Sequence, residues 1–75
     1  MGASVVQRLQ EDLQDLAREQ KLYQDEMSYL QKGPRPGILA QRHAARLTAC
    51  QKNLTWVASQ LQATRQALAR EQVAA

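Results

Sequence analysis

The stretch Gly33-Pro34-Arg35-Pro36-Gly37 decides how this chain folds. Two prolines and two glycines within five residues cannot continue a helix. On both sides of this stretch, apolar residues recur at intervals of three and four residues, which is the spacing of one face of an α-helix. Gly33, Pro34, Pro36 and Gly37 therefore form a hinge between two amphipathic helices.

The hinge divides the chain of 75 residues into three parts. We expect a first helix over residues 4–32, the hinge over 33–37 and a second helix over 38–72. A hinge this short folds adjacent helices back on each other, so the expected fold is all-α: a two-helix coiled-coil hairpin (αα-hairpin). Its second helix is the longer and should overhang the first at its free end. An extended, kinked rod, in which each half pairs with the same half of another chain, stays open as the alternative.

The first helix carries an unbroken heptad seam, which is typical of a coiled coil. Gln20 is the one polar residue in it; such a residue either fixes the register or is tolerated with its end in water. Leu22 and Tyr29 lie off the seam at c positions and widen the apolar surface. The seam consists of Val6, Leu13, Gln20 and Met27 at position a, and of Leu9, Leu16, Tyr23 and Leu30 at position d.

The second helix has a uniform a column and a small or polar d column, which favours close packing in a bundle. Trp56, off the seam, either covers the core of that bundle or is an exposed binding anchor. Position a holds Ala40, Leu47, Leu54, Leu61 and Leu68, and position d holds His43, Cys50, Val57, Thr64 and Glu71. The expected helix interface comprises Val6, Leu9, Leu13, Leu16, Tyr23, Met27, Leu30, Leu47, Cys50, Leu54, Val57, Leu61 and Leu68.

Charge is divided unequally between the two helices. Residues 1–32 carry four basic and six acidic side chains, a net charge of −2, whereas residues 38–75 carry five basic and one acidic, a net charge of +4. The two helices should attract each other, within one chain or between chains. A chain of this length buries little surface alone, so we expect it to self-associate into a helical bundle, as a dimer or a tetramer.

The sequence contains no pattern typical of an enzyme. His43 and Cys50 are one heptad apart, about 10.5 Å along a helix, which is too far to share a metal ion or to act as a nucleophile pair. We expect no catalytic residues, no cofactor, no metal site and no small-molecule substrate. The single cysteine indicates a reducing compartment, and no apolar run is long enough to insert into a membrane.

Basic residues of the second helix give an alternative function. Arg42, Arg46 and Lys52 could bind an acidic filament, such as a microtubule, or a nucleic acid directly. The basic residues do not form one stripe, however, and are sparser than in a basic-zipper helix. Together with Trp56, these three are the candidate partner-binding residues.

Two groups of residues have a counterpart in a known family. The first helix contains Leu13-Gln14-Asp15, followed by Leu22, Met27 and Leu30 before a break with proline. The second contains Arg46-Leu47, followed by Ala49, Leu54, Ala58, Gln60 and Leu61. Together they resemble the C-terminal coiled-coil microtubule-binding segment of translokin-type centrosomal proteins, from which Pro36 and Gly37 depart. The resemblance implies a dimerising centrosomal segment whose Arg42, Arg46 and Lys52 face the acidic tails of tubulin.

These observations predict an oligomerisation and protein–protein interaction module of a larger intracellular scaffold. The expected partner is a second copy of the chain, another helical protein, or both. The resemblance adds a cytoplasmic location at the cytoskeleton or the centrosome.

Overall fold

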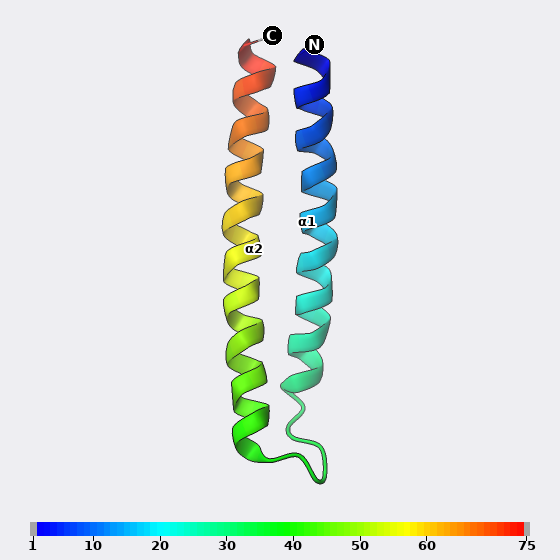
Figure 1. The fold of residues 1–75 in the computed structure, drawn as a ribbon, viewed down its shortest axis with the longest axis vertical. Helices are drawn as coiled ribbons and strands as arrows, with labels where there is room; N and C mark the ends of the chain where they lie inside the picture. Colours follow the sequence, from blue (N-terminus) through cyan, green and yellow to red (C-terminus); the bar gives the residue numbers. More distant parts are fainter. Residues whose placement is uncertain (1, 75) are drawn as a thin grey trace.

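The computed structural model describes residues 2–74, and the side-chain surroundings of residues 5–73. It consists of helix α1 (Gly2–Leu30), a connection over residues 31–39, and helix α2 (Ala40–Ala74). Figure 1 shows the two helices antiparallel and side by side along their whole length. The molecule is a rod with extents of 56 × 15 × 14 Å. The all-α helical hairpin expected from the sequence is confirmed, and this chain does not adopt the extended rod.

Helix α1 ends because Gly33 leaves the helical conformation. The last turn tightens into bonds three residues apart: the amides of Lys32 and Gly33 donate to the carbonyls of Tyr29 and Leu30, both at 3.2 Å. Gly33 has a φ of +104°, in the left-handed region that side chains disfavour. Pro34 follows and has no amide with which to continue the helix.

A second tight turn brings the chain into α2. The amide of Ile38 donates to the carbonyl of Arg35 at 3.1 Å, which closes a β-turn over residues 35–38. Pro36 occupies the second position of this turn and Gly37, with a φ of +85°, the third, as a type II turn requires. The amide of His43 then donates to the carbonyl of Leu39 at 3.1 Å, in the first turn of α2.

The helix boundaries differ from those expected. α1 begins at Gly2 and ends at Leu30 rather than spanning residues 4–32, and α2 spans Ala40–Ala74 rather than 38–72. The non-helical connection is longer than the hinge itself because the constraints of glycine and proline also act on neighbouring residues. The expected overhang is wrong: the helices reach about the same level at the termini, and α2 extends further at the hinge end (Figure 1).

The hydrophobic core lies along the contact between the two helices. Every buried hydrophobic side chain of the described residues occupies an a or d position of the two seams, and Val57 is completely buried. Near the hinge, Tyr23, Leu47 and Leu54 pack around a cluster of three of them. The buried side chains are Met27, Leu30, Cys50, Val57 and Leu61.

Thr64, a polar seam residue of α2, is accommodated by a hydrogen bond within its own helix. Thr64 is half-buried at a d position, and its hydroxyl donates to the carbonyl of Gln60 at 2.7 Å. Such a bond to the preceding turn satisfies the hydroxyl without a partner on α1. Glu71, the last d residue, is exposed and adds nothing to the interface.

Candidate interaction surface

One side of the hairpin carries large exposed apolar side chains from both helices. Glu26 and Arg46 both occupy g positions and are joined across the helices at 3.4 Å, so the g sides of α1 and α2 face the same way. Position c neighbours position g on a helix, which puts Leu22, Tyr29 and Trp56 on this side as well. They are 67%, 46% and 54% exposed. We call this side, formed by the g and c positions of both helices, the g/c face.

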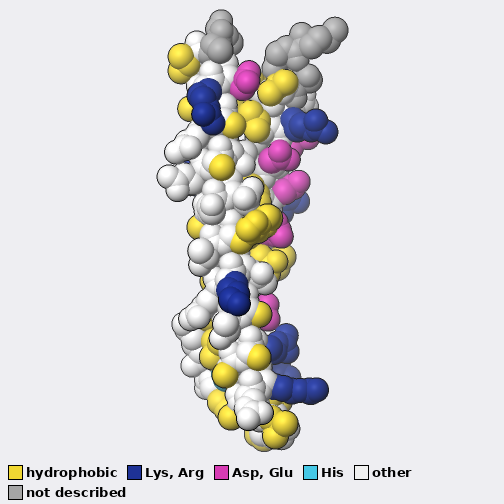
Figure 2. All heavy atoms as spheres, turned by 60° about the vertical axis from the view of Figure 1, so that its left-hand side comes forward, with side chains coloured by type: hydrophobic (Ala, Val, Ile, Leu, Met, Phe, Trp, Pro, Cys, Tyr) yellow, Lys and Arg dark blue, Asp and Glu magenta, His cyan; other side chains and the backbone are white. Residues whose placement is uncertain are grey.

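Trp56 is exposed in the single hairpin. This exposure is compatible with both roles expected from the sequence, a cover over the core of a bundle and an exposed binding anchor. Figure 2 shows exposed hydrophobic side chains distributed over one face of the hairpin, with most of the acidic side chains on its right-hand side.

Charges on the g/c face are complementary between the helices. On α1 one basic and four acidic residues give −3, and on α2 three basic residues give +3. Those of α1 are Arg8, Asp12, Asp15, Glu19 and Glu26, and those of α2 are Arg42, Arg46 and Arg70.

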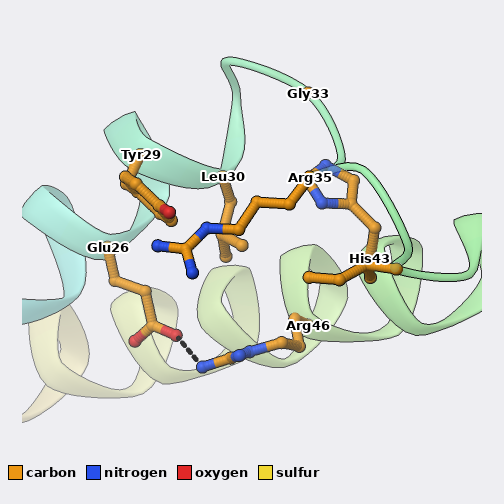
Figure 3. Close-up of a pocket in the computed structure, with 8 residues that line it drawn as sticks. Glu26, Tyr29, Leu30, Gly33, Arg35, His43 and Arg46 are labelled. Atoms are coloured by element: carbon orange, nitrogen blue, oxygen red, sulfur yellow. Dashed lines mark hydrogen bonds and ion pairs between the residues drawn. The ribbon is translucent and has the colours of Figure 1, made fainter.

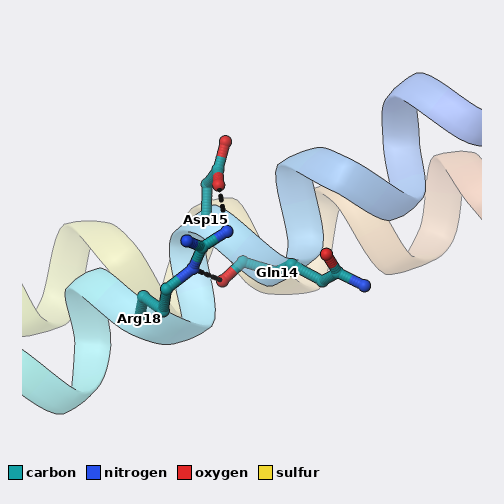
Figure 4. A network of polar contacts seen from close by, with 3 residues as sticks. All are labelled: Gln14, Asp15 and Arg18. Atoms are coloured by element: carbon teal, nitrogen blue, oxygen red, sulfur yellow. Dashed lines mark hydrogen bonds and ion pairs between the residues drawn. The ribbon is translucent and has the colours of Figure 1, made fainter.

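Some of this charge is already paired within α1. Arg18 donates from Nη2 to Asp15 Oδ1 at 2.8 Å, and from Nε to the carbonyl of Gln14 at 3.5 Å (Figure 4). Both charged side chains are about two-thirds or more exposed. Exposed pairs one helical turn apart stabilise a helix by only about 0.3–0.5 kcal/mol. Asp15 therefore stays available to an approaching basic side chain.

The hinge end contains a hollow that the sequence did not predict. Its cavity volume is about 200 Å³, and Arg35, His43 and Arg46 line it together with apolar groups. Figure 3 shows Arg35 extending across the hollow toward Tyr29, with Glu26 and Arg46 joined below it. The guanidinium carbon of Arg35 lies 4.9 Å from the centre of the Tyr29 ring, a cation–π distance.

Ile38 and Leu39 extend this apolar surface and are 42% and 69% exposed. A signal for them exists in the sequence: two large apolar residues directly after Gly37 lie off the heptad seam. They also line a second hollow with Gly37, Arg42, Ala45 and Arg46. Ile38 and Arg46 border both hollows, which are therefore neighbours.

The four candidate partner-binding residues do not form one site. Arg42 and Arg46 lie at the hinge end and line its hollows. Trp56 lies further along the g/c face. Lys52 is exposed at an f position, which points away from the partner helix.

His43 and Cys50 have different surroundings. His43 is half-buried beside the hinge hollow, whereas Cys50 is 3% exposed between the helices. The Cys50 thiol donates to the carbonyl of Tyr23, with a distance of 3.2 Å from Sγ. Burial, and after it the negative charge of Glu26, raises the pKa of this thiol. A cysteine in such surroundings is a packing residue of low reactivity.

Comparison with protein families, characterised proteins and solved structures finds no match for this chain. Neither described helix contains a run long and apolar enough to cross a bilayer. The fold and the surface thus define the chain as a helical hairpin whose g/c face carries exposed apolar side chains.

Proposed function

We propose that this chain is an oligomerisation and protein–protein interaction module, whose g/c face binds a second copy. The observation that carries the proposal is the surface that the hairpin leaves exposed. Its accessible area is 5986 Å², whereas a compact protein of 8.4 kDa exposes about 4,600 Å². The excess of about 1,400 Å² per chain matches what one subunit buries in a large, permanent dimer interface.

The half of the hairpin near the termini supports the same proposal. Among the described residues of α1, the buried ones, Met27 and Leu30, lie in its last turns near the hinge, whereas the earlier seam residues are only half-buried. Partly exposed leucines at a and d positions gain burial when a further helix covers them. These half-buried residues are Val6, Leu9, Leu13 and Leu16.

Charge complementarity favours a second copy as the occupant of the g/c face. A twofold axis parallel to the helices, placed between two such faces, lays α1 of each copy on α2 of the other. The net charge of −3 on this side of α1 then faces the net charge of +3 on the other copy's α2, and Glu26 lies level with Arg46 of that helix. In the same arrangement, the exposed side chains of Leu22 and Trp56 come from opposite helices and both become buried in the interface. The product is an antiparallel four-helix bundle.

We further propose that the module belongs to a larger scaffold protein. A bundle of this kind would join copies of a larger intracellular scaffold, and the sequence resemblance favours the cytoskeleton or the centrosome. Direct binding to a microtubule or a nucleic acid is less well supported, because Lys52 lies apart from Arg42 and Arg46. A dimer would present twice the positive charge of one chain to a microtubule or to a nucleic acid.

Association through the g/c face can be tested by removing its apolar side chains. We expect Leu22→Gln combined with Trp56→Gln to weaken dimerisation at least a hundredfold, since about 1.5–3 kcal/mol is lost for each large side chain that returns to water. Helicity should be unchanged, because both residues are exposed in the hairpin. Sedimentation velocity measures the first and circular dichroism the second.

The matched control is Val73→Gln, which changes an 88% exposed side chain at an f position, outside the g/c face. This variant should dimerise as the unmodified chain does. Equal dimerisation of the Leu22/Trp56 variant and the control would exclude the g/c face as the interface.

A further inference from the structure

The hinge end of the rod combines positive charge with exposed apolar surface. Between Glu26 and Glu71 the sequence contains seven basic residues and no acidic one. Four of the seven lie within or next to the connection: Lys32, Arg35, Arg42 and Arg46. Acidic side chains are confined to the preceding turn of α1, so the electrostatic potential at this end is positive.

The exposed apolar side chains at the hinge end surround two hollows. Tyr29, Ile38 and Leu39 are 46%, 42% and 69% exposed, and Ile38 separates the two neighbouring hollows. The hollow beside Tyr29 has a volume of about 200 Å³, which fits a single aliphatic side chain of a partner. The neighbouring hollow beside Leu39 is larger, about 570 Å³, and leaves room for the residues that flank such an anchor.

We propose that the hinge end is a docking site for an acidic polypeptide segment that carries an aliphatic anchor side chain. The anchor occupies the hollow beside Tyr29 and Ile38, while flanking carboxylates bind the guanidinium groups of Arg35, Arg42 and Arg46. A planar guanidinium matches a carboxylate in geometry, and its hydrogen bonds to that group are charge-assisted. The site shares Tyr29, Arg42 and Arg46 with the g/c face, so it is open in the single hairpin and peptide binding competes with self-association for these residues.

An incoming carboxylate can replace the one that Arg46 already contacts. The Arg46–Glu26 distance of 3.4 Å is longer than the 2.7–2.9 Å of strong charged bonds. The two side chains are 69% and 40% exposed, and an ion pair of this kind is worth at most about 1 kcal/mol. Exchange of Glu26 for a partner carboxylate therefore costs little.

A membrane surface is a poorer occupant of the same end. Insertion at a lipid interface requires an extended apolar face, such as that of an amphipathic helix. Here Ile38 and Leu39 form a short apolar tip beside a turn, and the arginines surround a hollow rather than lying in one plane. The observations therefore favour a peptide.

The test uses the full chain and a fluorescein-labelled peptide in which two leucines are flanked by glutamates on both sides. Binding is followed by fluorescence anisotropy. Arg35→Gln with Arg42→Gln should weaken binding at least tenfold, because two charge-assisted contacts are lost. The control Lys52→Gln with Arg65→Gln removes the same charge from α2 at positions outside both the hinge end and the g/c face, and should change the affinity less than twofold.

The apolar part of the site needs its own pair of variants. Ile38→Ser with Leu39→Ser should weaken binding at least fivefold, whereas Val73→Ser should have no effect. Serine at position 39 is a better N-cap than leucine, so α2 is not destabilised by this change. A peptide with serines in place of its leucines should bind as weakly to the unmodified chain as the original peptide does to the Ile38/Leu39 variant.

Three results would overturn the proposal. Equal losses of affinity from the two charge-removing double variants would mean diffuse attraction to a basic chain. Unchanged affinity of the Ile38/Leu39 variant would exclude an apolar anchor. Binding to vesicles of phosphatidylcholine and phosphatidylserine, without binding to the peptide, would identify a lipid surface as the partner.

Discussion

Val57→Asp is expected to unfold the hairpin. Val57 is 0% exposed, so its replacement puts a carboxylate between the two helices. An uncompensated buried charge costs about 3–5 kcal/mol, which equals the whole stability that a core of this size supplies. The far-ultraviolet circular dichroism signal should lose most of its helical component at a concentration where the unmodified chain is helical.

Val73→Asp is the matched control for this substitution. It introduces the same charge into the same helix at a side chain that is 88% exposed. The free energy of unfolding should fall by less than about 1 kcal/mol, because the only unfavourable change is a negative charge near the C-terminus of a helix. Unfolding by urea should be compared at equal chain concentration, because association shifts apparent stability. Wild-type helicity and urea midpoint in Val57→Asp would show that Val57 does not lie between the helices.

The Cys50 thiol should react with iodoacetamide at least a hundredfold more slowly in the folded chain than in urea. Both the burial of the thiol and its raised pKa slow the reaction. The side chain is 3% exposed, and desolvation raises the pKa of the thiol, which lowers the fraction of reactive thiolate at neutral pH. Alkylation then requires the helices to separate, so its rate reports the free energy of opening.

A surface thiol on the same helix provides the comparison. In the double variant Cys50→Ser with Gln62→Cys, the thiol replaces an exposed side chain and should react at the rate of a free cysteine. Mass spectrometry of quenched samples measures both rates. Equally fast alkylation of Cys50 in the folded chain would mean that the contact between α1 and α2 opens freely.

Heptad spacing alone predicts which residues lie between the helices. Met27 and Leu30 on α1, and Cys50, Val57 and Leu61 on α2, were assigned to the seams from the sequence and are the buried side chains of the hairpin. The assignment is reliable because a strict 3.5-residue repeat leaves only one side of a helix apolar enough to face a partner.

The ends of the helices depend on interactions that the heptad pattern does not contain. α1 stops at Leu30 because Gly33 takes a positive φ, and α2 starts at Ala40, after the β-turn over residues 35–38 in which Gly37 also takes a positive φ. The exposure of Trp56 could not be assigned because an off-seam aromatic residue can face either a core or solvent.

The site at the hinge end could not be predicted from the heptad pattern either. Its parts come from α1, the connection and α2, and the distance between Arg35 and Tyr29 depends on how the two turns combine. By contrast, the Glu26–Arg46 pair could have been anticipated. In an antiparallel hairpin the g positions of the two helices face each other, and these two residues occupy them.

Self-association of the hairpin can be measured most directly as the molar mass of the unmodified chain. Sedimentation equilibrium across the micromolar range should give twice the chain mass of 8.4 kDa. A mass of 8.4 kDa at every concentration, with a fully helical spectrum, would contradict the proposal, because the hairpin would then be stable with its g/c face exposed to water.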